Sequence, residues 1–116
     1  QTAVKYQLDN LVVFVDNNRL QIDGFCDEIM PVLDLEKKFE AFGFETKRID
    51  GHSMEAIVET LDEIRELKNG KPKCIVLDTV KGKGVSYMED IAEWHGIAPN
   101  DEEFNQAMEE IAGGLK

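Results

Sequence analysis

The stretch LVVFV at residues 11–15, followed by DNNRLQIDG at residues 16–24, decides the fold class of this chain. A short apolar run of this kind is typical of a strand buried on both faces, as in a parallel sheet covered by helices. The segment after it is rich in short side chains that carry oxygen atoms. Ligands of open α/β sheets bind at the carboxyl ends of the strands, so residues 16–24 form a candidate binding segment.

The side chains of residues 16–24 allow two interpretations. Asn and Asp oxygens suit a hard cation such as Mg²⁺, which takes few protein ligands and shares phosphate oxygens. The same residue types also form Asx-turns where a strand ends. The local sequence alone therefore leaves both a metal site and a simple turn open.

Helices and strands alternate after the first strand. Asp34 can cap a helix over residues 35–42 that carries an apolar stripe, and residues 44–49 predict a second strand. Ser53 can cap a longer amphipathic helix, and residues 74–77 predict a third, apolar strand. Strand, helix, strand, helix, strand is a βαβαβ unit, which predicts the α/β class with parallel strands and helices on both faces of the sheet.

Three segments follow the three strands and should emerge at one edge of the sheet, and these are residues 16–24, 50–52 and 80–95. The last of them contains KGKG at residues 81–84, where glycines and lysines would allow a phosphate to approach. It matches neither the Walker pattern nor the dinucleotide fingerprint, so a flexible basic turn is the alternative.

His95, between Trp94 and Gly96, is a candidate donor to a phosphate or sugar oxygen, with a structural surface histidine as the alternative. Farther along, Asn100 and Glu103 predict a capping box before a last amphipathic helix.

Composition narrows the classes of partner. The chain has 116 residues, which predicts one domain or a piece of one. Its net charge of −11, from 24 acidic and 13 basic residues, argues against nucleic acid or an anionic membrane surface as the main partner. No apolar run has the length of a membrane span, and no leader pattern precedes the first strand. Cys26 and Cys74 form no CxxC pair, so we expect a cytoplasmic protein, with Cys74 in the core.

Read together, these motifs resemble one family. They are residues 16–24, residues 42–44 with 49–52, TVKGKG at residues 79–84, and WHG at residues 94–96. In this order and spacing the sequence resembles the thiamine-diphosphate-binding domain of transketolases, specifically the amino-terminal subunit of the split, two-chain bacterial form. The resemblance covers residues 8–111. The related synthase that makes deoxyxylulose phosphate shares a Gly-Lys-Gly turn but is less similar at residues 20–24 and 50–52.

The resemblance implies roles for four residues. Asn18 would bind Mg²⁺, or Ca²⁺ in its place, through its side-chain oxygen, and Leu20 would bind the same ion through its main-chain carbonyl. Ile22 would pack near the thiazolium ring of thiamine diphosphate. His95 would act as a catalytic residue that contacts the diphosphate and the donor sugar.

The cofactor motif of the family begins with Gly-Asp-Gly, which this chain does not contain. The resemblance places that motif before Gln1. Residues 1–116 are therefore expected to be the C-terminal portion of a thiamine-diphosphate-binding domain.

The resemblance also implies the function. The intact enzyme would transfer a two-carbon ketol unit between phosphorylated sugars, as in the pentose phosphate pathway. The glutamate that activates the cofactor belongs to a pyrimidine-binding subunit or domain, which is the expected partner in a dimer or heterotetramer. This chain alone is then expected to be inactive. Two alternatives stay open: a related enzyme such as deoxyxylulose-phosphate synthase, and a non-catalytic interaction fragment in which Asn18 and His95 only stabilise loops.

Overall fold

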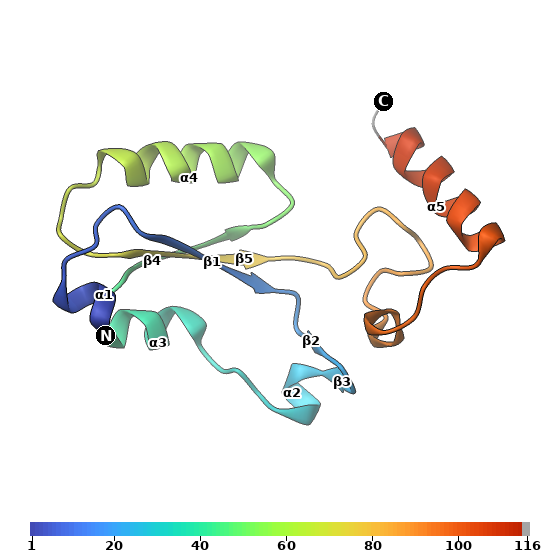
Figure 1. The fold of residues 1–116 in the computed structure, drawn as a ribbon, viewed down its shortest axis with the longest axis horizontal. Coiled ribbons are helices and arrows are strands. Elements are labelled where there is room, and N and C mark those ends of the chain that lie inside the picture. Colours follow the sequence, from blue (N-terminus) through green and yellow to red (C-terminus); the bar gives the residue numbers. More distant parts are fainter. Residues whose placement is uncertain (115–116) are drawn as a thin grey trace. The chain divides into compact units, whose positions relative to one another are not determined.

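The computed structural model describes residues 1–114, which form two compact units. The first, which we call the sheet unit, comprises residues 1–17 and 32–79. Its elements are α1 (Thr2–Lys5), β1 (Val12–Asn17), α3 (Leu35–Ala41), β4 (Glu45–Asp50), α4 (Met54–Glu66) and β5 (Lys73–Asp78) (Figure 1). The second, the loop unit, comprises residues 18–31 and residues 80–114 of the described chain. Its elements are β2 (Leu20–Gln21), β3 (Gly24–Phe25), α2 (Cys26–Ile29), the 3-10 helix η1 (Ala92–His95) and α5 (Asp101–Gly114).

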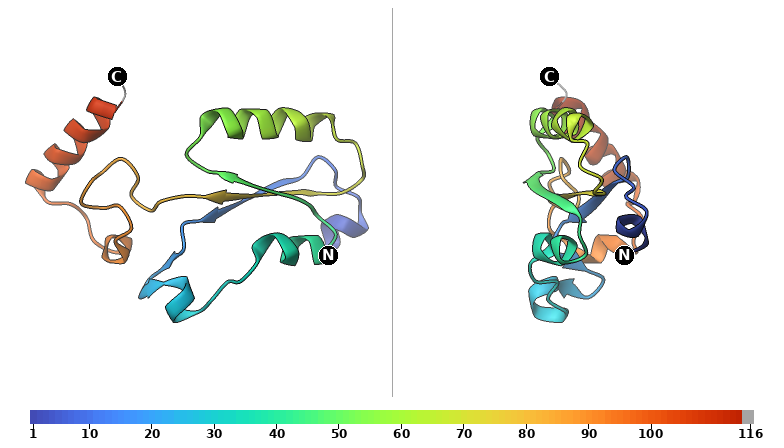
Figure 2. Two further views of the ribbon diagram at one scale, coloured as in Figure 1. Left: turned by 180° about the vertical axis from the view of Figure 1, so that it is seen from behind. Right: turned by 90° about the vertical axis from the view of Figure 1, so that its left-hand side faces the viewer.

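The sheet unit is a parallel α/β arrangement, as the sequence predicts. Its strands lie in the order β1-β5-β4, and β5 pairs in parallel with both neighbours. Helix α4 lies over one face of the sheet and α3 over the other (Figures 1 and 2). The register places Asn17 and Asp50 opposite Asp78, so the three strands end together at one edge. The predicted βαβαβ order and the common carboxyl edge are confirmed.

The expectation that the first strand is buried on both faces is wrong for the described chain. Strand β1 pairs on one side only among the described residues, and Phe14 keeps 49% of its surface exposed. The fully buried strand is β5, in which Cys74, Ile75 and Val76 are each 0% exposed. The reason is the strand order, because β5 is flanked by a strand on both sides and covered by helices on both faces.

The helix caps form as predicted. The Asp34 carboxylate accepts a hydrogen bond from the Lys37 backbone N–H at 3.0 Å at the start of α3. The Ser53 hydroxyl accepts one from the Ala56 backbone N–H at 3.2 Å at the start of α4. Both bonds satisfy N–H groups that a helix leaves unpaired in its first turn.

A buried lysine at the start of β5 was not expected from the sequence. Lys73 is 0% exposed, and its ammonium donates to three neutral oxygens. These are the Asp9 carbonyl at 3.1 Å, the Asn69 side-chain oxygen at 3.0 Å and the Lys71 carbonyl at 2.6 Å. Because all three N–H groups have an acceptor, the buried charge is compensated by hydrogen bonds and ties two loops to the sheet.

Cys74 yields a prediction about thiol chemistry. Burial raises the pKa of its thiol to about 11, because the charged thiolate is disfavoured in the core. We expect Cys74 to resist alkylation at pH 8 in the folded protein and to react rapidly once the protein is unfolded, as measured by mass spectrometry of the peptide that contains it. The folded state favours the neutral thiol. The Cys74 thiol therefore contributes fully to the free energy of unfolding below pH 9.0, and this contribution is lost as the pH rises to about 11. Rapid labelling of the native protein at pH 8 would contradict this burial.

The loop unit contains elements that the sequence pattern did not predict. Strands β2 and β3 form a two-stranded antiparallel sheet, in which Leu20 pairs with Phe25, and α2 follows directly. Strands of two residues are too short to show an alternation of apolar and polar positions.

The capping box predicted at the start of α5 forms. The Asn100 side chain accepts a hydrogen bond from the Glu103 N–H at 2.9 Å, and the Glu103 carboxylate accepts one from the Asn100 N–H at 2.8 Å. In residues 1–114, no helix combines the length and the apolar character needed to span a membrane.

Candidate functional site

Two of the oxygen-bearing residues after the first strand have structural roles. The Asn17 side-chain amide donates to the Asp78 carboxylate at 2.7 Å, and the Thr79 hydroxyl donates to the Asp16 carboxylate. Arg48 donates to both oxygens of Asp78, each at 2.7 Å, and this hydrogen bonding raises the pKa of the Arg48 guanidinium. Asp16 and Asn17 thus hold the ends of neighbouring strands together.

Asn18 forms the turn that the sequence left open as an alternative. Its side-chain oxygen accepts a hydrogen bond from the Leu20 backbone N–H at 2.9 Å. Arg19 between them has a φ of 61°, a left-handed conformation that a tight turn requires. An amide oxygen has two lone pairs, so it can close this turn and still bind a cation. The turn and the metal site are therefore compatible.

The carbonyl of Leu20 points away from the hairpin partner. The Cys26 N–H donates to the Arg19 carbonyl at 2.8 Å, which makes these two residues a hydrogen-bonded pair. Hydrogen-bonded and non-hydrogen-bonded pairs alternate along an antiparallel ladder. Leu20 and Phe25 are the next pair, so the N–H and C=O of Leu20 both face outward. The Leu20 N–H donates to the Asn18 side-chain oxygen, and the Leu20 carbonyl lies on the same side of the hairpin as that oxygen.

One pocket of the loop unit collects the residues singled out from the sequence. It has a volume of about 320 Å³ and is lined by Asn18, Leu20, Gln21, Ile22, Lys81 and His95. All four site residues implied by the resemblance, from Asn18 to His95, are therefore brought together. The sequence did not single out Gln21 as a lining residue, although it lies within the candidate binding segment of residues 16–24. Lys81 carried a signal in the KGKG motif.

The loop after residue 80 is closed on itself and holds the backbone of Lys81. The Asp90 N–H donates to the Lys81 carbonyl at 3.0 Å, across the base of the loop. Gly82 has a φ of +74°, and a Cβ at this position would lie 2.5 Å from the Met88 carbonyl oxygen. The loop can pack this closely because residue 82 has no side chain.

His95 lies at the end of η1, next to an anchored aromatic pair. The Trp94 indole N–H donates to the Tyr87 carbonyl at 2.9 Å, and the centroids of the two rings are 5.2 Å apart. The Tyr87 hydroxyl in turn donates to the Glu103 carbonyl of α5 at 2.6 Å. Loss of solvent raises the pKa of Tyr87, and nearby Glu103 and Glu110 raise it further. These contacts tie the segment that carries His95 to α5.

The chemistry of the lining residues suits a metal-bound diphosphate. Asn18 and Leu20 offer neutral oxygens of the kind that Mg²⁺ accepts alongside phosphate oxygens. Lys81 and His95 offer N–H donors to anionic oxygens, and Ile22 offers an apolar side chain that is 67% exposed. Within residues 1–114 no three His, Cys, Asp or Glu side chains gather in a way that could hold a metal, so a cation here would depend on amide and carbonyl oxygens and on the ligand.

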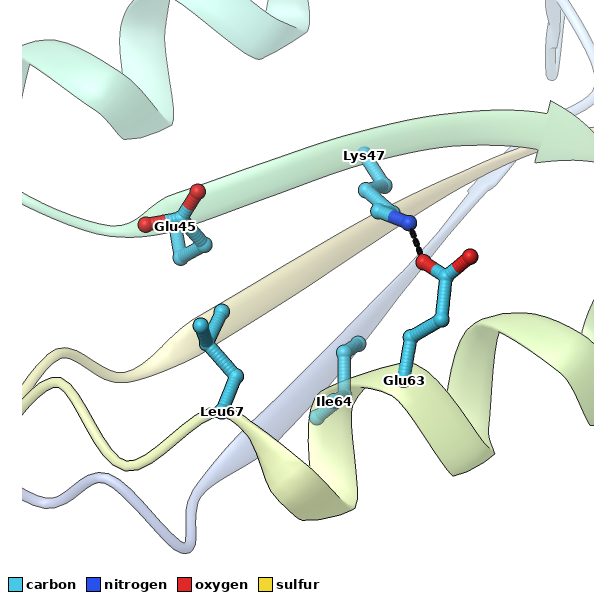
Figure 3. Close-up of a pocket in the computed structure, with 5 residues that line it drawn as sticks. All are labelled: Glu45, Lys47, Glu63, Ile64 and Leu67. Atoms are coloured by element: carbon cyan, nitrogen blue, oxygen red, sulfur yellow. Dashed lines mark ion pairs between the residues drawn. The ribbon is translucent and has the colours of Figure 1, made fainter.

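A second hollow, in the sheet unit, lacks this chemistry. It has a volume of about 250 Å³ between β4 and α4 and is lined by Glu45, Lys47, Glu63, Ile64 and Leu67 (Figure 3). Lys47 and Glu63 form an ion pair across it, so the two charges compensate each other. No residue implied by the motifs lines this hollow.

Comparison with known proteins agrees with the motifs. Residues 1–114 match the family described as the transketolase, thiamine diphosphate binding domain. An apulose-4-phosphate transketolase subunit from Actinobacillus succinogenes is 41% identical over 110 residues, which cover 95% of this chain and 39% of that protein. The 6-deoxy-6-sulfo-D-fructose transketolase subunit SqwG of Clostridium sp. (strain MSTE9) is 39% identical over 105 residues, covering 90% of this chain and 38% of that protein.

Solved structures show the same fold. Transketolase from Campylobacter jejuni superposes with a TM-score of 0.85 and 29% identity, over 96% of this chain and 17% of that one. The chain thus spans about two fifths of the curated relatives and less of the longer transketolases. With a family match over residues 1–114, the chain belongs to the transketolase family of thiamine diphosphate-binding domains.

Proposed function

We propose that this chain is part of a subunit of a split transketolase, in which it anchors thiamine diphosphate through Mg²⁺. The intact enzyme transfers a two-carbon ketol unit between phosphorylated sugars. Two relatives support a split enzyme, because each is named as a transketolase subunit. On this proposal residues 1–116 form the C-terminal portion of the thiamine-diphosphate-binding domain, and the partner is a pyrimidine-binding subunit in a dimer or heterotetramer.

The observation that carries this proposal is the turn from Asn18 to Leu20 on the wall of the loop-unit pocket. The turn directs one side-chain oxygen and one main-chain carbonyl to the same side. Lys81 and His95 line the same pocket and supply donors for an anion. Two cation ligands beside two anion donors form the arrangement expected for a metal-bound diphosphate.

Each residue then has a defined task. Asn18 and Leu20 hold the metal in the loop-unit pocket, and Ile22 packs against the ring of the cofactor. His95 donates a hydrogen bond to the oxygens of the diphosphate and the donor sugar. Thiamine diphosphate supplies the carbanion chemistry when bound, whereas the protein orients the reactants and stabilises charge.

We also propose a cytoplasmic enzyme of sugar-phosphate metabolism. Both cysteines of the described chain are free thiols, and both are buried. Free thiols are typical of a reducing compartment.

Replacing Asn18 tests this proposal. In the complete enzyme, Asn18→Ala should weaken binding of thiamine diphosphate at limiting Mg²⁺ by about 1–3 kcal/mol, because one ligand of the cation is lost while the others remain. Excess Mg²⁺ should restore part of the affinity. Isothermal titration calorimetry at several Mg²⁺ concentrations measures both effects.

Two variants serve as controls for this measurement. Asn18→Asp keeps an oxygen for the turn and for the cation, so it should retain Mg²⁺-dependent binding. Asn105→Ala, on the exposed surface of α5, should behave as the wild type. An unchanged affinity of Asn18→Ala at limiting Mg²⁺ would leave Asn18 with its role in the turn alone.

A further inference from the structure

We propose that Tyr87 is a positioning residue, which orients His95 in the loop-unit pocket by holding Trp94 and joining it to α5. This inference rests on the proposed function and deepens it, since it names a residue on which the role of His95 depends. Tyr87 is not among the described residues that line the pocket. Its effect on the reaction must therefore pass through the segment that carries His95.

The His95 side chain depends on its neighbours for its orientation. Among residues 1–114 the imidazole has no hydrogen-bond or ion-pair partner, and His95 is exposed. It belongs to η1, a 3-10 helix of four residues that begins without a side-chain cap. Such helices are short and have poorer hydrogen-bond geometry than α-helices. The position of the imidazole therefore depends on what holds the rest of η1 in place.

Trp94, directly before His95, is held by Tyr87. The Trp94 indole N–H donates to the Tyr87 carbonyl at 2.9 Å. The two rings lie 5.2 Å apart between centroids with an angle of 57° between their planes, a contact that favours one arrangement of the pair. Because Trp94 and His95 are adjacent, fixing the indole limits the backbone conformations that His95 can adopt.

Tyr87 is in turn held by α5. Its hydroxyl donates to the Glu103 carbonyl in the first turn of that helix at 2.6 Å. A carbonyl oxygen has two lone pairs, so it can accept this bond in addition to one within the helix. Loss of solvent and the nearby carboxylates of Glu103 and Glu110 raise the pKa of Tyr87, so the hydroxyl keeps the proton that it donates.

A second anchor lies at the preceding residue. The Ser86 backbone N–H and hydroxyl donate to the two carboxylate oxygens of Glu110 at 2.6 Å and 2.7 Å. Glu110 also accepts a hydrogen bond from Gln106 at 2.7 Å, and these bonds lower the pKa of its carboxyl group. Two adjacent residues are thus bonded to positions 103 and 110 of one helix, which restricts both the position and the rotation of Tyr87.

The contacts between α5 and this segment orient more than they stabilise. Phe104, Met108 and Ile111 of α5 are 53%, 52% and 45% exposed, so these apolar side chains are only partly covered in the described chain. The anchors are instead directional hydrogen bonds, each of which contributes about 0.5–1.5 kcal/mol to stability. Small errors in the placement of a reacting group reduce the rate strongly. Loss of one anchor should therefore affect turnover more clearly than folding.

The test uses the full-length subunit in complex with its partner subunit, saturated with thiamine diphosphate and Mg²⁺. Tyr87→Phe removes the hydroxyl and keeps the ring, and Trp94→Phe removes the indole N–H. Tyr6→Phe is the matched control, because Tyr6 is the second of two tyrosines and is 64% exposed in the sheet unit. Steady-state kinetics use a phosphorylated ketose donor that the wild type turns over, and thermal unfolding reports stability.

Two further measurements distinguish positioning from stability. The double variant of Tyr87→Phe and His95→Ala shows whether Tyr87 acts through the imidazole, since residues that act through each other have non-additive effects. The fluorescence anisotropy of Trp94, the single tryptophan of the chain, reports the mobility of η1 in wild-type protein, Tyr87→Phe and Tyr6→Phe.

We expect Tyr87→Phe to lower kcat about 3- to 10-fold, the scale of one lost hydrogen bond, with a smaller change in KM and a melting temperature close to that of the wild type. Trp94→Phe should lower kcat to a similar extent. In the His95→Ala background, Tyr87→Phe should reduce kcat no further. The anisotropy of Trp94 should fall in Tyr87→Phe, whereas Tyr6→Phe should match the wild type in every measurement.

Other results would overturn the role of Tyr87. A wild-type kcat in Tyr87→Phe, or a lower melting temperature with normal turnover in the folded fraction, would leave the residue with a structural role alone. An equal loss of kcat with and without His95 would show that Tyr87 does not act through the imidazole. The proposed function survives these outcomes if Asn18→Ala still weakens Mg²⁺-dependent binding, whereas a wild-type protein that binds no thiamine diphosphate would remove both proposals.

Discussion

His95→Ala in the complete enzyme is expected to reduce turnover by about 100-fold or more, the scale of lost acid–base or electrostatic assistance. The imidazole lines the pocket with the proposed metal ligands, where it can donate to oxygens whose charge would change during the proposed ketol transfer. Its position at the end of the short helix η1 involves little core packing, since His95 is an exposed residue. The melting temperature without ligand should therefore change little. Steady-state kinetics and thermal unfolding of one variant measure both effects.

A conservative variant separates the two roles that His95 could have. His95→Gln keeps an N–H donor but lacks the imidazole, so it should recover part of the turnover if hydrogen bonding is the main contribution. A histidine that only stabilises the loop would produce a lower melting temperature with nearly normal turnover in the folded fraction. That second pattern would exclude His95 from the site.

Gly82→Ala is expected to destabilise the loop after residue 80 by about 3 kcal/mol, because two costs add. The residue has a φ of +74°, which is unfavourable for alanine, and the new Cβ would lie 2.5 Å from the Met88 carbonyl oxygen. The loop must move to relieve this contact, and the movement displaces the neighbouring Lys81. We therefore expect a lower melting temperature and also a weaker affinity for thiamine diphosphate, measured by thermal unfolding and calorimetry.

Gly84 supplies a matched control in the same loop. Its φ is +95°, but an added Cβ would meet no atom within 4 Å. Gly84→Ala should therefore show the conformational cost alone, roughly 1–2 kcal/mol. The difference between the two variants isolates the close approach at Gly82. Equal losses of stability would mean that residue 82 does not pack against Met88.

The candidate site could be predicted only in part. The motifs singled out Asn18, Leu20, Ile22 and His95, and the structure gathers these residues around one pocket. They left open whether Asn18 forms a turn, and they did not show that a short hairpin turns the Leu20 carbonyl outward. Such geometry depends on a left-handed residue and on strands of two residues, for which periodicity offers no signal.

The sequence by itself determined the order along the chain of the three parallel strands and of helices α3, α4 and α5, and where these three helices begin. A cap such as Asp34 or Ser53 acts on a backbone N–H three residues away, so the information is local. The reciprocal bonds of Asn100 and Glu103 follow the same rule. Apolar runs and amphipathic stripes likewise depend on neighbours in the sequence.

Only the tertiary structure decided which strand is central and which polar residues line the pocket. The sequence predicted a strand buried on both faces at β1, but pairing on both sides makes β5 the buried strand. Asp16 and Asn17 resemble Asn18 in chemistry, yet their partners Thr79 and Asp78 lie about 60 residues away along the chain. Long-range contacts of this kind leave no local pattern, because they depend on how the whole chain packs.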